Sequence, residues 1–143
     1  MNPIIDIANA VVERIQEAYP ELNVSRHYNP KIQLEKLGPT IINVSPFSAA
    51  IEPNDRGRRK YNIVIDVYVL AKIHSGSDEE IDPLMQLVND ISLLFEHFEP
   101  DVGNGSTCIQ IENKPIYSRG MIDENRQFSS RLALTFIVLE VIR

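Results

Sequence analysis

Apolar residues recur at helical spacing over residues 3–19, and the flanking residues supply start and stop signals. Asn2 can cap this helix, and Pro3 suits its first position because a proline has no backbone N–H to leave unpaired there. Pro20 ends it, because a proline disfavours helical angles in the residue before it. The pattern therefore predicts an amphipathic helix at the start of the chain.

A second apolar stripe runs to about residue 98 and stops before Pro100. Two starts are open for this helix. Ser77 with Glu80 three residues later fits a capping box, whereas Asp82-Pro83 fits a start one turn further on. Either start predicts a second main helix.

Five stretches read as strands, because they alternate or are rich in β-branched residues. Strands do not alternate regularly with crossover helices, so the order α-β-β-β-α-β-β predicts an α+β fold with a mostly antiparallel sheet and both main helices on one face. The expected strands are residues 24–28, 40–45, 61–73, 106–112 and 130–141.

The segments between these elements read as turns. Pro46 is expected to stop the strand before it, so residues 46–60 are predicted to form one long loop. Asp123-Glu124-Asn125 is the expected turn before the last strand. Residues 30–37 fit either a helical turn or an extended arm.

The two longest strands are apolar on both faces, and two helices can cover only one face of about four strands. The second face needs another cover, which is either residues 20–45 or another subunit. The second possibility makes this face a candidate interface. Its candidate residues are Val64, Tyr68, Leu70, Ile137 and Leu139.

The composition fits one soluble domain spanning residues 1–143. Of these 143 residues, 43% are hydrophobic and 24% are charged, and the net charge is −6. The acidic balance argues against a protein coated in nucleic acid. We expect no signal peptide and no membrane span, because acidic residues interrupt the first apolar stretch and no apolar run approaches about 20 residues.

Few residues are arranged for chemistry, so we expect no enzyme activity, no metal and no cofactor. His27, His74 and His97 lie in different segments, and Cys108 falls in an apolar strand where it is expected to pack. The acids around residues 78–82 suit a helix start rather than a calcium loop. A cleft that joined a histidine to Cys108 and an acid would contradict this expectation.

One cluster is unusual in an acidic chain. Its four basic residues lie within five positions of the expected long loop, as Arg56, Arg58, Arg59 and Lys60. They form either a solvated loop or a patch that contacts an anion, such as a phosphate or an acidic partner. Few apolar contacts can hold such a loop, so we expect residues 50–60 to be mobile in the isolated subunit.

The order and texture of the whole chain resemble one known family. The segments VSRHYNPKIQLEKLGPTIINVSP, YNIVIDVYV, LMQLVNDISLLF and SSRLALTFIV, with a basic loop before the second of them, are similar to the tail terminator and tail-completion proteins of long-tailed bacteriophages. The resemblance rests on spacing rather than on an invariant motif.

The resemblance implies a structural protein of the virion, located in the tail or neck and assembled in the host cytoplasm. Members of this family form hexameric rings that cap the tail tube and join it to the head connector, around a channel for DNA. Expected partners are therefore further copies of this chain, tail tube and head-connector proteins, and DNA in the channel. Two alternatives stay open: a neck or head-completion protein of related fold, and a small nucleic-acid-binding module that uses residues 56–60.

Overall fold

The computed structural model describes residues 2–28 and 40–141, and these residues form one mixed five-stranded sheet with three helices. The α+β fold expected from the sequence is confirmed. The expected segment 30–37 lies outside the described residues. In chain order the elements are α1 (Pro3–Ala18), β1 (Asn23–Arg26), β2 (Ile41–Asp55), β3 (Arg58–Lys72), α2 (Asp78–Leu93), β4 (Gly105–Asn113), α3 (Arg119–Asn125) and β5 (Gln127–Val141).

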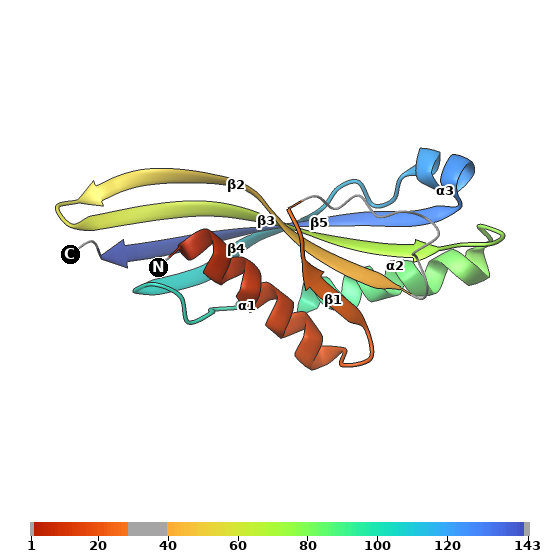
Figure 1. Cartoon of the computed structure of the whole chain (residues 1–143), viewed down its shortest axis with the longest axis horizontal. Coiled ribbons are helices and arrows are strands. Elements are labelled where there is room, and N and C mark those ends of the chain that lie inside the picture. Colours follow the sequence, from red (N-terminus) through yellow and green to blue (C-terminus); the bar gives the residue numbers. More distant parts are fainter. Residues whose placement is uncertain (1, 29–39, 142–143) are drawn as a thin grey trace.

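The strands lie in the order β1-β2-β3-β5-β4. All neighbours are antiparallel except β1, which pairs in parallel with residues 41–44 of β2. The sheet is therefore mostly antiparallel, as predicted. Figure 1 shows the turn between β2 and β3 at one end of the molecule, and the start of α2 together with α3 at the opposite end.

Helices α1 and α2 pack on the same face of the sheet, as the sequence predicted (Figure 1). Alternate residues of β3 and β5 fill the core beneath them. Arg14 connects the two helices, because its Nε donates a hydrogen bond of 3.2 Å to the Leu94 carbonyl and its guanidinium lies 5.3 Å from the centre of the Phe98 ring. The fully buried core side chains include Ile7, Ile15, Ile63, Ile65, Ile91, Phe95, Phe128, Leu134 and Phe136.

Both main helices start at positions that the sequence predicted, but only α1 has the predicted capping hydrogen bonds. The Asn2 side chain accepts hydrogen bonds from the N–H groups of Ile4 and Ile5, as expected of a cap. Helix α2 begins after Ser77, which excludes the later start at Asp82, but the Ser77 side chain makes no capping bond. Glu80 instead accepts four hydrogen bonds of 2.9–3.0 Å from the backbone N–H groups of residues 74–76.

The long loop predicted at residues 46–60 is wrong. Strand β2 continues through Pro46 to Asp55, and β3 returns from Arg58, so the two form a long hairpin. Pro46 does not stop the strand because its position faces away from β3, where a missing N–H removes no bond of the ladder. Gly57, at φ 81°, supplies the left-handed conformation of the tight turn.

The turn predicted at residues 123–125 is also wrong, because these residues end a short helix, α3. The Ser118 side chain caps this helix by accepting a hydrogen bond of 3.3 Å from the Met121 N–H. Arg126 ends it in the left-handed conformation, at φ 52°, and β5 begins directly after. A helix of two turns has too little apolar periodicity to be recognised from the sequence.

Candidate assembly surfaces

All five residues of the candidate sheet-face interface lie on the face opposite α1 and α2, but they are not equally accessible. Leu139 is 38% exposed, and Val64, Tyr68 and Ile137 are partly buried. Leu70 is only 3% exposed, so it offers almost no surface to a partner. The accessible apolar part of this face therefore lies toward the hairpin end of the sheet.

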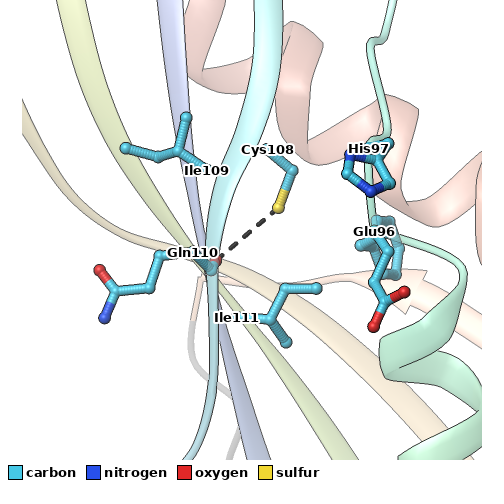
Figure 2. A pocket seen from close by; sticks show the side chains of 7 residues that line it. Glu96, His97, Cys108, Ile109, Gln110 and Ile111 are labelled. Atoms are coloured by element: carbon cyan, nitrogen blue, oxygen red, sulfur yellow. Dashed lines mark hydrogen bonds between the residues drawn. The ribbon is translucent and has the colours of Figure 1, made fainter.

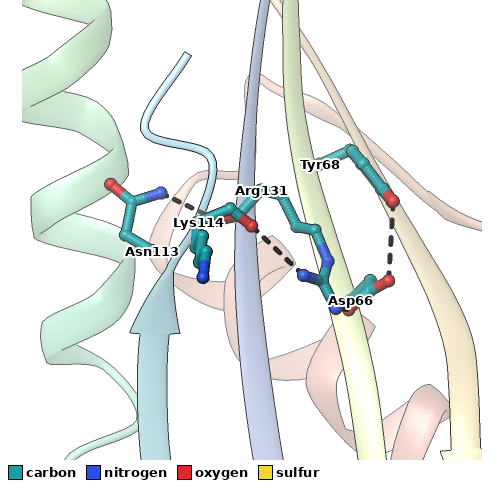
Figure 3. Close-up of polar contacts among 5 residues, drawn as sticks. All are labelled: Asp66, Tyr68, Asn113, Lys114 and Arg131. Atoms are coloured by element: carbon teal, nitrogen blue, oxygen red, sulfur yellow. Dashed lines mark hydrogen bonds and ion pairs between the residues drawn. The ribbon is translucent and has the colours of Figure 1, made fainter. Parts of the chain in front are cut away.

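The centre of the same face holds an ion pair that the sequence did not reveal. Arg131 of β5 places its Nη2 atom 2.8 Å from Oδ1 of Asp66 on β3, and the Asp66 side chain is only 3% exposed. The Tyr68 hydroxyl donates a longer hydrogen bond of 3.5 Å to Oδ2 of the same carboxylate (Figure 3). A lone aspartate and a lone arginine in two apolar strands were the available signal, but only the strand register brings them together.

The pKa values of Tyr68 and Arg131 are both raised at this site. Burial raises the pKa of Tyr68, and the negative charge of Asp66 raises it further. The hydrogen bond with Asp66 raises the pKa of Arg131. The Arg131 guanidinium also lies 5.1 Å from the centre of the Phe47 ring, and Phe47 is 63% exposed. These two residues line a hollow of about 210 Å³ on the sheet face.

Buried polar side chains gather around this pair on the side toward β1. Asn43, Ser45 and Asp66 are each at most 5% exposed, although all three lie on the face away from the two main helices. Among the described residues, neither the amide nitrogen nor the amide oxygen of Asn43 has a hydrogen-bond partner. The face is therefore divided into a buried polar part and an accessible apolar part.

The four basic residues 56, 58, 59 and 60 lie at the tip of the β2–β3 hairpin, and the structure interleaves acidic residues with three of them. Arg58 forms an exposed ion pair of 3.8 Å with Asp55. Arg59 and Lys60 lie opposite Glu140 and Glu52 in the strand register. The Tyr61 hydroxyl bridges the first of these pairs, accepting from Arg59 at 3.4 Å and donating to Glu140 at 3.1 Å. The local positive charge is therefore much smaller than the sequence suggested.

A cleft of about 500 Å³ brings together three residue types that can take part in catalysis. Glu96, His97 and Cys108 line it, with Phe95 and residues 109–111 (Figure 2). This is the kind of cleft that would contradict a purely structural protein. However, in the described part of the chain the Cys108 thiol donates to the Gln110 carbonyl at 3.7 Å, and His97 hydrogen-bonds to neither Cys108 nor Glu96.

The surroundings of the Cys108 thiol in this cleft favour its protonated form. Burial raises the pKa of Cys108, and the contact with the Gln110 carbonyl offsets this only in part. A nucleophilic cysteine needs the opposite shift, toward the thiolate. The geometry therefore favours the packing role that the sequence predicted for Cys108.

The other histidines have local partners. The His27 ring shares a hydrogen bond of 2.8 Å with the Ser25 hydroxyl, and His74 lies in the loop whose N–H groups bind Glu80. Across residues 2–28 and 40–141, no three side chains of His, Cys, Asp or Glu are grouped so that they could hold a metal ion. No helix in those ranges is long and apolar enough to cross a membrane.

Comparison with protein families finds none that matches this chain, and comparison with curated proteins finds no significant match.

Proposed function

We propose that this chain is a structural subunit of a long-tailed phage, similar to tail terminators, that forms a ring, caps the tail tube and joins it to the head connector. By family resemblance the ring has six copies. The proposal rests on the sequence resemblance described above, which begins with residues 24–46, and on one feature of the fold.

That feature is a sheet face that the two main helices leave uncovered. Leu139 and Phe47 are exposed on this side of the sheet, and Val64 and Ile137 are partly accessible. Burying this apolar surface in a partner would release about 25 cal/mol for each Å² removed from water, which supports a protein contact on this face. The tail tube, the head connector or a further copy supplies such a cover, and in a closed ring every head-to-tail contact between copies has a partner.

The hairpin tip is the proposed contact with another protein, either the next copy in the ring or the tail tube. Because acidic residues accompany Arg58, Arg59 and Lys60, a protein surface fits this tip better than a continuous run of phosphates. Arg56, in the turn, is the basic residue without an acidic residue opposite it in the strand register. The alternative of a nucleic-acid-binding module therefore has less support than the assembly protein.

The first test is the mass of the native particle, measured over a range of protein concentrations and followed by electron microscopy. We expect a closed ring. A strict monomer at high concentration, both alone and with tail tubes, contradicts the proposal. A salt titration of DNA binding tests the alternative, because phosphate contacts give an affinity that falls steeply with salt. A ring that occupies the head side of the neck instead of the tube end favours the neck or head-completion protein.

A further inference from the structure

Strand β2 has an outer edge that two prolines enclose. The His27 N–H donates to the Val44 carbonyl at 2.8 Å, so the backbone polar groups of Val44 face β1 and not β3. Successive residues of a strand point their N–H and carbonyl groups to opposite sides. Beyond the bulge at Phe47, the β2–β3 register shows which residues point these groups toward β3 and which point them away. The positions that face outward, away from β3, are therefore Pro46, Ala49, Ile51 and Pro53.

This edge is open over a defined window. Strand β1 pairs only with residues 41–44, and among the described residues no hydrogen bond uses the outward N–H groups of Ala49 and Ile51. A proline cannot donate to a neighbouring strand, so Pro46 and Pro53 close both ends of the window. Residues 47–52 alone can accept another strand, and Ile51 is 48% exposed there.

Strand β4, at the opposite side of the sheet, has a matching open segment. The Lys114 N–H donates to the Arg131 carbonyl, and the Asn104 N–H donates to the Leu139 carbonyl, so the register turns Cys108, Ile111 and Asn113 outward. The Cys108 N–H is used by the Phe98 carbonyl at 2.9 Å, which closes one end. The described chain leaves the edge from 109 to 113 unpaired, and Ile109 is 52% exposed.

We infer that the β4 edge of one copy, residues 109–113, pairs with the β2 edge of a second copy, residues 47–52. The inference rests on the proposed ring and names the contact that closes it. The two windows have nearly equal length, and each carries an exposed isoleucine. Each presents two outward-facing residues whose backbone N–H and carbonyl groups have no hydrogen-bond partner in the described part of the chain. Two hydrogen-bonded pairs, or about four bonds, can form between them.

Strand polarity agrees with a ring. Strands β2, β3, β5 and β4 alternate in direction, so β4 runs antiparallel to β2. When two copies lie side by side with the same sheet face pointing the same way, β4 of one copy therefore lies next to β2 of the other. The two strands are then antiparallel. The helices of all copies then lie on the same side of one continuous sheet.

Charge also agrees with this pairing. When β2 of the second copy runs antiparallel to β4, its turn extends past Ile109 toward the segment that covers Cys108. Glu96, Glu99 and Asp101 are exposed in and beside that segment. Arg56 and Arg58 of the incoming turn would meet these acids, which is a use for the basic tip that requires no nucleic acid.

The first test is Ala49→Pro, studied in the full chain with Ala49→Ser as matched control. Proline removes the outward N–H and no bond of the β2–β3 ladder, so the fold remains while pairing between copies is blocked. We expect circular dichroism and Tm close to those of the parent, and at least a tenfold loss of self-association by sedimentation velocity. Ala49→Ser keeps the N–H and should assemble as the parent does. Assembly of Ala49→Pro at the parent's concentration overturns the inference.

A second test does not depend on how the proline variant folds. In a Cys108→Ser background, Ala50→Cys is combined in turn with Gln110→Cys and with Glu112→Cys. The backbone N–H and carbonyl groups of these positions point into their own sheets, so across the new edge they would form a non-hydrogen-bonded pair, in which the two side chains lie close together. Oxidation should give a ladder of covalent multimers that ends at the ring size, which neither single cysteine can give.

The outcomes separate the contact from the function. If the parent forms rings but neither cysteine pair gives a ladder, the edge pairing is wrong and the ring stands on another surface. If Gln110→Cys alone gives covalent dimers in high yield, β4 pairs with β4 about a two-fold axis, which also overturns the inference. If the parent is monomeric at all concentrations, both alone and with tail tubes, the contact and the proposed function both fail.

Discussion

Replacing Arg131 by methionine should destabilise the fold more than any other single change on the open sheet face. Methionine keeps most of the length of the side chain but removes the charge that lies 2.8 Å from Asp66. Asp66 cannot turn toward water, because only 3% of its side chain is exposed. Leaving a buried charge without its partner typically costs about 3–5 kcal/mol.

The other contacts of Arg131 add less. Its contact with the exposed Phe47 ring contributes about 0.5–1 kcal/mol at a site of this kind, and its Nη1 donates one hydrogen bond of 3.1 Å to the Lys114 carbonyl. The Tyr68 hydroxyl, at 3.5 Å from Asp66, is too distant to replace the guanidinium. For a chain of this length the loss corresponds to a decrease in Tm of roughly 10 °C.

The assay is equilibrium unfolding in urea, followed by circular dichroism at several protein concentrations so that assembly does not hide the effect. The double variant Asp66→Leu/Arg131→Met should be more stable than Arg131→Met alone, because removing both charges leaves none buried and unpaired. If Arg131→Met lowers the free energy of unfolding by less than about 1 kcal/mol, the Asp66 carboxylate reaches water in solution and is not buried as described here. If the double variant is as unstable as the single one, the loss comes from packing and not from charge.

Three further predictions concern other parts of the chain. Backbone hydrogen bonds from residues 74–76 hold the pKa of Glu80 below its ordinary value. The contribution of Glu80 to stability is therefore present above that ordinary value and is lost as the pH falls through the folded-state pKa. Glu80→Gln should lower Tm at pH 7 and differ less from the parent at low pH, while Glu79→Gln, at an exposed neighbouring position, should change Tm little. Since partial burial raises the pKa of Cys108, a thiol reagent at pH 8 should label the folded chain several-fold more slowly than the chain in denaturant, and equal rates would contradict the raised pKa. Neutralising the four basic residues of the hairpin tip should change Tm by less than about 5 °C, because three of them are exposed and Lys60 is only partly buried. It should weaken self-association mainly at low salt, and loss of folding would show that these residues are structural.

The local signals in the sequence were sufficient where one residue controls one boundary. Asn2, Pro3 and Pro20 set the ends of α1 through caps and backbone angles, which depend only on neighbours in the chain. The apolar patterns of residues 61–73 and 130–141 also predicted correctly two long strands, because alternation along a strand is a local property. Fold class and helix packing followed from these features.

Tertiary structure decided what depends on pairing between distant segments. Pro46 interrupts a strand only if its missing N–H faces a partner, and that direction is known only once β2 is placed beside β1 and β3. For the same reason the cluster at residues 56–60 looked like a free basic loop, although Glu52 and Glu140 lie across from it in the sheet. The Asp66–Arg131 pair joins residues 65 positions apart in the chain. Register determines which charges meet and which strand edges remain open, and it is set by the whole sheet rather than by any segment alone.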